Sequence, residues 1–205
     1  MNIPFSFWKT ASPKRKRIYS AIVMLVLIIL TTLLGTLVQL SAQDAKQLTD
    51  DLNKVATDNP TYGSRVVAIF LHNFSLTLLM FIPLVGAAIG LFVMFSSGIG
   101  LRAIFDTQSA SAASSQLTNL STTTIIIALV FTVLTFVLEY VSYILAMTES
   151  VWLFRRLTQR RWGELKTAGI LIGITAIMLI LAAIVETWVV SLPLSSSIFS
   201  DFLYF

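Results

Sequence analysis

An acidic residue, Glu139, lies in the middle of an apolar segment that spans residues 125–154. The polar and small residues of this segment are spaced by alternate threes and fours, which places them on one face of a helix. They are Thr132, Thr135, Glu139, Ser142, Ala146 and Glu149. Because an ionisable side chain at membrane depth is costly without a partner or water, this face indicates a protein interior. Glu139 is therefore either the centre of a functional site or a hydrogen-bonded residue in a face that only packs against another helix.

Four more polar residues lie in apolar segments and are candidates for a polar intramembrane centre around Glu139. From the depth of each residue in its segment, we expect Asn73 to meet Glu139. Glu186 and Arg102 lie near the outer ends of their predicted helices, where either side chain can cap the same centre by an ion pair. His72, the only histidine, either makes a structural hydrogen bond or relays protons with Glu139.

The sequence contains no motif that predicts an enzyme. There are no cysteines, which excludes disulfides, thiol catalysis and thiolate metal ligands. A single histidine cannot make the His and carboxylate cluster of a hydrolytic zinc site, and there is no Gly-rich phosphate loop or nucleophile with its base. An intramembrane protease built on Glu139 requires a second acid at the same depth, for which Glu186 is the candidate. We therefore predict no catalytic residue, no metal and no cofactor.

The composition is that of an integral membrane protein. Of 205 residues, 56% are hydrophobic and 12% are charged, and the mean hydropathy is +0.85, whereas soluble domains contain roughly 25% charged residues. The basic residues form two clusters, at 14–17 and 155–166, and both flank apolar segments. This position favours membrane topology and contact with lipid headgroups over nucleic acid binding. Glu149 is expected to pair with Arg155 or Arg156 of the second cluster.

The apolar segments predict an all-α, polytopic membrane bundle of about five transmembrane helices. Pro83 and Gly86 predict a tight turn between the second and third helices, and a polar loop at 106–121 precedes the fourth. The predicted crossings are residues 18–40, 66–82, 86–104, 122–154 and 167–190. The fourth is too long for a hydrocarbon core of about 30 Å, so we expect it to tilt, to protrude or to break near Glu139.

The two basic clusters predict the orientation of the chain in a cell membrane. If both are cytoplasmic, four crossings lie between them and the fifth leaves the C-terminus outside. The chain then divides into four segments. These are a cytoplasmic basic N-terminus at 1–17, an anchor helix with an external extension at 18–65, the main bundle at 66–190 and an external aromatic tail at 191–205.

The first helix is predicted to project from the membrane as far as residue 57. Ala45, Leu48, Leu52 and Val55 continue its three-four spacing beyond the apolar segment. If it is unbroken, the helix has about 40 residues, is roughly 60 Å long and ends before Pro60. Its projecting apolar stripe predicts contact with the membrane surface or with a partner chain.

Two pairs of glycines predict close approach between helices. They are Gly86 and Gly90, and Gly169 and Gly173, each pair four residues apart. Small residues at this spacing let helix backbones pack closely, either within one chain or at the seam of a dimer.

Three blocks of the sequence resemble a known membrane protein family. The block Ile69-Phe-Leu-His-Asn73, with the apolar run that follows it and Gly98-Ile-Gly100-Leu101, looks like the "F-x-N-N... G... G-x-x-x-G" region of the stage II sporulation protein M family. Val137-Leu138-Glu139 resembles the family's "G-V-L-E", and the residues that end at Glu186 resemble its "L-A-A-L-I-E". The order and spacing of the blocks agree from about Ile69 to Val190.

The resemblance has two departures. The family's "P-H-G" before the glutamate is Leu134-Thr135-Phe136 here, and the first asparagine of its pair is His72. The family pattern therefore carries over to Asn73, Glu139 and Glu186, and no histidine function carries over to Thr135.

The resemblance implies an integral membrane protein of bacteria or archaea. The sporulation member of the family is similar to a scaffold that holds cell-wall hydrolases at the membrane, and other members are suspected assembly or transport components. We expect a scaffold or accessory subunit that binds a membrane protein partner or a second copy of itself. A buried polar centre around Glu139 leaves a transporter or channel component as the alternative.

Overall fold

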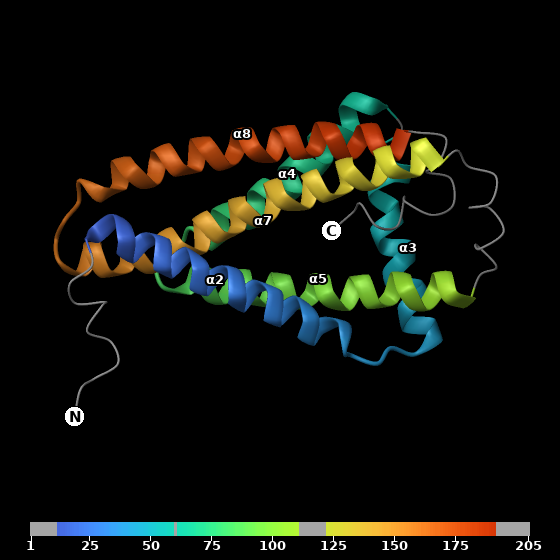
Figure 1. The fold of residues 1–205 in the computed structure, drawn as a ribbon, viewed down its shortest axis with the longest axis horizontal. Coiled ribbons are helices and arrows are strands. Elements are labelled where there is room, and N and C mark those ends of the chain that lie inside the picture. The colour runs from blue at the N-terminus through green and yellow to red at the C-terminus, as the bar shows by residue number, and fades with distance from the viewer. Residues whose placement is uncertain (1–11, 60, 111–121, 192–205) are drawn as a thin grey trace.

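The chain folds as an all-α bundle in the residues that its computed structural model describes, which are 12–59, 61–110 and 122–191 (Figure 1). The helices are α2 (Pro13–Thr36), α3 (Ala42–Asp58), α4 (Tyr62–Met80), α5 (Val85–Ala110), α7 (Thr122–Thr158) and α8 (Glu164–Ser191). All except α3 are long and apolar enough to cross a membrane. The predicted class, a multi-pass helical membrane protein, is therefore confirmed. The predicted external tail at 192–205 lies outside the described residues.

Local sequence signals explain where the helices begin. Ser12, Ser41 and Thr61 precede α2, α3 and α4, and each side chain accepts a hydrogen bond from the backbone N–H three residues later. Such N-caps satisfy one of the four unpaired donors at a helix start. The turn predicted between the second and third crossings is also present, because α4 ends at Met80 and α5 begins at Val85. Leu84 occupies this turn with a positive φ of 70°.

The first helix is not continuous as far as residue 57. The structure ends α2 at Thr36 and starts α3 at Ala42, so the predicted 60 Å helix is wrong. Ser41 is the cause, because its side chain caps a new helix by accepting from the backbone of Asp44 at 3.1 Å. The interruption allows α3 to turn back across the end of the bundle, where it packs against α5 and also meets α4 (Figure 1).

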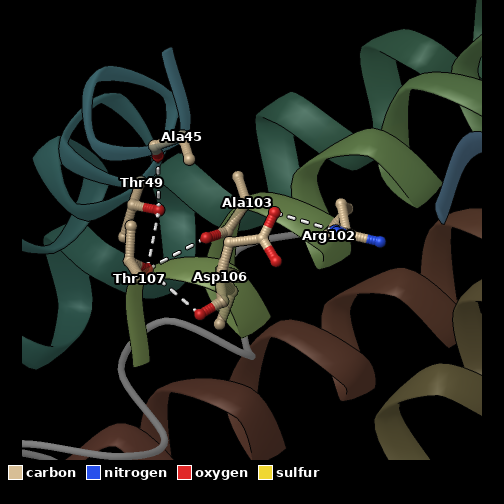
Figure 2. Close-up of polar contacts among 7 residues, drawn as sticks. Ala45, Thr49, Arg102, Ala103, Asp106 and Thr107 are labelled. Carbon is tan, nitrogen blue, oxygen red and sulfur yellow. Dashed lines mark hydrogen bonds and ion pairs between the residues drawn. The ribbon is translucent and has the colours of Figure 1, made fainter. Parts of the chain in front are cut away.

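The described part of the apolar stripe of α3 lies partly against this chain itself. Ala45 is 1% exposed, and Leu48 is half-buried. Thr49 lies 3.4 Å from Thr107 of α5, oxygen to oxygen, and donates to the carbonyl of Ala45 (Figure 2). Ala45 is therefore buried within this chain, where α3 packs on α5, and it does not face an external partner. The side chains of Leu52 and Val55 lie outside the described part.

The fourth crossing is one unbroken helix. Helix α7 has 37 residues, which corresponds to roughly 55 Å at 1.5 Å per residue. The predicted break near Glu139 is absent, so the excess over a hydrocarbon core of about 30 Å must be taken up by tilt or by protrusion. The predicted loop at 106–121 is also shorter at its start, because α5 continues to Ala110.

Glycines set the distance between three helices. Gly35 of α2 faces Gly98 of α5, and a Cβ built on either residue would lie 2.1 Å from a backbone oxygen of the other helix. A Cβ on Gly90 would lie 2.5 Å from the sulfur of Met147 on α7. Gly90 therefore lies close against α7 and Gly86 close against the end of α4, and the Gly35–Gly98 crossing is a contact that the sequence analysis missed. It makes α2 part of the same bundle as the later helices.

Helix α8 does not use its glycines for packing in this chain. A Cβ on Gly169 or Gly173 would meet no atom within 4 Å. The expectation that this pair packs within the chain is corrected for the described residues, because the buried face of α8 is instead the one that contains Thr175, Leu179 and Ala183.

The two basic clusters meet at one end of the bundle. Arg17 at the start of α2 pairs with Glu164 at the start of α8, with 2.9 Å between Nη2 and Oε2. Both clusters therefore lie at the same end of the bundle, which is the arrangement that the predicted orientation requires.

A cysteine-labelling experiment tests which side of the membrane this end faces. The chain has no cysteine of its own, so Lys46→Cys on α3 and Gly163→Cys between α7 and α8 each introduce one thiol. An impermeant thiol reagent is expected to label residue 46 in intact cells and residue 163 only after the cells are opened. The reverse pattern would contradict a cytoplasmic basic end.

Candidate functional site

The centre of the bundle contains the predicted contact between Asn73 and Glu139. Asn73 of α4 donates from Nδ2 to Oε1 of Glu139 on α7 across 2.7 Å. The two residues are 3% and 4% exposed. The bond joins two helices through residues that are 66 positions apart in the sequence. A carboxyl group at this depth, charged or neutral, needs such a hydrogen-bond donor.

The polar face of α7 points into the bundle, as its spacing predicts. Thr132, Thr135, Ser142, Ala146 and Glu149 are all buried together with Glu139. The hydroxyl groups on this face, however, donate to carbonyl oxygens four residues earlier on the same helix. They are therefore satisfied locally, and among the described residues Asn73 is the one that hydrogen-bonds the carboxyl of Glu139.

A second carboxyl lies near the first. Glu186 of α8 is 2% exposed, and Glu139 interacts with it electrostatically. Tyr143, also buried, lies within electrostatic reach of both carboxyls. Within the described residues, Glu186 has no hydrogen bond or ion pair. Helices α4, α7 and α8 thus bring together Asn73, Glu139, Tyr143 and Glu186, as predicted for the three residues other than Tyr143.

The predicted ion pair from Arg102 to this centre is wrong. Arg102 pairs instead with Asp106, one turn later on α5, across 2.8 Å, and both side chains are more than a third exposed (Figure 2). A partner on the same helix at i+4 is available without any tertiary arrangement. Glu139 and Glu186 consequently have no cationic partner among the described residues.

His72 is also not part of the centre. Its side chain is exposed on the outer surface of α4, because consecutive residues point about 100° apart on a helix and Asn73 takes the inward position. A proton relay from His72 to Glu139 is therefore excluded by geometry in this structure.

The recess beside Glu139 is almost filled. It is lined by Met94, Ser97, Leu101, Phe136, Glu139, Tyr140 and Tyr143, and the volume open to the centre of a water molecule is about 10 Å³. One buried water requires roughly 10–15 Å³ on this measure. The recess therefore has room for one water molecule at most. The site is closed, and its hydrogen bond between Asn73 and Glu139 links two helices.

Glu149 belongs to the basic end of the bundle and not to the centre. It lies 3.6 Å from Arg17 of α2, whereas Arg155 or Arg156 was the predicted partner. Arg156 instead pairs with Glu164, with 3.4 Å between Nη1 and Oε1. The sequence analysis missed Arg17 as an interhelical residue; its place in the 14–17 cluster was the only local signal.

Among the residues that the structure describes, no three His, Cys, Asp or Glu side chains are grouped so that they could hold a metal ion. Comparisons with protein family models, with curated proteins and with solved structures found no match.

Proposed function

We propose that this chain is a non-enzymatic integral membrane protein that acts as a scaffold or accessory subunit of a membrane complex. The observation that carries the proposal is the outer face of α8. Gly169 and Gly173 are exposed one turn apart, with open space above both, and Ile170 and Ile177 beside them are 64% and 62% exposed. Two glycines at this spacing leave a shallow groove into which a second transmembrane helix packs.

The polar centre supports the same proposal. Asn73 links α4 to α7 through Glu139 at 2.7 Å, and the adjacent recess of about 10 Å³ is too small for a solute larger than water. A hydrogen-bonded bundle with an exposed packing face on α8 suits a subunit that positions a partner. The resemblance of the Asn73, Glu139 and Glu186 blocks to the stage II sporulation protein M family points in the same direction.

Bulky residues on the outer face of α8 test the proposal. In the double variant Gly169→Leu and Gly173→Leu, leucine fills the groove, while the open space above both glycines leaves the fold of the chain intact. We expect the complex purified in mild detergent to lose its partner helix. Native mass spectrometry should then show a mass that falls from that of the complex toward that of the single chain.

The matched control is Ala88→Leu, which adds similar bulk to an exposed position on α5. It should leave the mass of the complex unchanged. The identity of the lost component separates a second copy of this chain from a different subunit. A single chain in mild detergent before any substitution, or a complex that survives the double substitution, would overturn the proposal.

A transporter component is the second candidate, and one observation favours it. Glu139 and Glu186 are two buried carboxyls that interact electrostatically and have no cationic partner among the described residues, an arrangement that can exchange protons. Proton flux into vesicles that contain the purified protein, and its loss in Glu139→Gln, would favour this candidate over a scaffold.

A further inference from the structure

A cavity at the basic end of the bundle lies between the start of α2 and the end of α7. Its volume open to the centre of a water molecule is about 160 Å³, and it is lined by Lys16, Trp152, Arg155, Arg156, Gln159 and Arg161. Since one water needs roughly 10–15 Å³ on this measure, the cavity has room for a group of several non-hydrogen atoms. It is separate from the polar centre around Glu139.

The lining is cationic and lacks a carboxylate. Four of its six residues are Lys or Arg. Arg156 has a partner, because Glu164 lies 3.4 Å away. Lys16, Arg155 and Arg161 make no ion pair with any residue of the described chain. Three positive charges that converge on one cavity repel one another, so an anion in the cavity would relieve this repulsion.

Trp152 is the second, independent observation. Its side chain is 5% exposed and lies beneath three guanidinium groups, those of Arg17, Arg155 and Arg156, at 5.5–5.9 Å from the ring centroid. The indole N–H is buried, yet it has no acceptor among the described residues. Buried donors in proteins are almost always paired, and a ligand oxygen would supply the missing acceptor.

We propose that this cavity binds a phosphate group that carries net negative charge and thereby holds the start of α2 against the end of α7. Guanidinium groups match phosphate oxygens in a forked geometry, and lysine adds a further charge. The cavity lies where membrane-spanning helices leave the apolar layer, so an anionic phospholipid headgroup and free inorganic phosphate are the two sources of such a group.

The test uses the purified full chain in a zwitterionic detergent at constant ionic strength. Short-chain phosphatidylglycerol, short-chain phosphatidylcholine and inorganic phosphate are titrated separately, and native mass spectrometry counts the bound molecules. We expect saturable binding of phosphatidylglycerol and none of phosphatidylcholine, whose choline cation is repelled by the lining. Phosphate that binds alone and displaces phosphatidylglycerol would assign the site to the soluble ion; phosphate that does neither would assign it to the lipid.

Two neighbouring arginines give a matched pair of variants. Arg161 lines the cavity and Arg160 does not; both are exposed in the turn after α7, so neither substitution disturbs the core. Arg161→Gln should weaken anion binding about tenfold, and Arg160→Gln should leave it unchanged although the net charge is the same. Trp152→Phe keeps the ring and removes the N–H, which should weaken binding about fivefold.

Equal losses in Arg160→Gln and Arg161→Gln would mean that diffuse charge attracts the anion, and this would overturn the proposed site. Binding that is unchanged in Arg161→Gln, or absent for both phosphatidylglycerol and phosphate, would overturn it as well.

Discussion

Replacing Gly98 with alanine should destabilise the bundle by about 1–3 kcal/mol, and replacing it with leucine should prevent α2 from packing on α5. The reason is geometric. A Cβ on Gly98 would lie 2.1 Å from the carbonyl oxygen of Thr32, which is backbone and cannot rotate away. Helix α2 must therefore move outward or detach. Thermal unfolding of the detergent-solubilised protein, followed by circular dichroism, measures the loss.

The control for this change is Gly63→Ala on α4. That glycine has open space around it, so a methyl group should be neutral or should stabilise the helix by up to about 1 kcal/mol, because alanine has the higher helix propensity. A Gly98→Ala variant that unfolds at the same temperature as the parent protein would show that the two helices do not cross at Gly35 and Gly98.

Replacing Asn73 with leucine should cost about 1–3 kcal/mol, because it leaves the carboxyl of Glu139 buried without a donor. Leucine has the same number of non-hydrogen side-chain atoms as asparagine and is larger, so the substitution leaves no cavity. His72→Leu, one residue earlier and exposed, is the matched control and should change stability little. Unfolding temperatures in detergent compare the two variants.

A double-mutant cycle separates the bond from its surroundings. Glu139→Leu alone leaves Asn73 unpaired, whereas the double variant with Asn73→Leu removes both partners and should recover part of the loss. Glu139→Gln should cost less than about 1 kcal/mol, because glutamine has the shape of a protonated glutamate and keeps an acceptor oxygen. Additive losses in the cycle would contradict the interhelical bond at 2.7 Å.

The sequence by itself was sufficient for the transmembrane segments and for the inward face of α7. A helix that crosses a membrane must be apolar over its own length, so its presence is a local property of the chain. The spacing of Thr132, Thr135, Glu139 and Ser142 likewise places them on one face whatever lies opposite. The contact with Asn73 could be predicted because depth in the membrane follows from position along each helix.

The break before α3 also had a local signal that the sequence analysis did not use. Ser41 followed by Asp44 is a typical helix start. The spacing of Ala45 and Leu48 concealed it, because the three-four spacing of apolar residues is the same before and after the interruption. Periodicity alone does not distinguish one long helix from two short helices with faces in register.

Tertiary structure alone decided which helix faces meet. Gly86 and Gly169 occur in the same small-residue pattern, yet one lies against another helix and the other is exposed. Arg102 and Glu186 have similar predicted depths in the membrane. Arg102 nevertheless pairs with Asp106 on its own helix, whereas Glu186 is buried inside the bundle. Depth along a helix is fixed by local sequence, whereas rotation about the helix axis depends on every neighbour that packs against it. For this reason the segments and depths followed from the sequence, and the partners of each side chain did not.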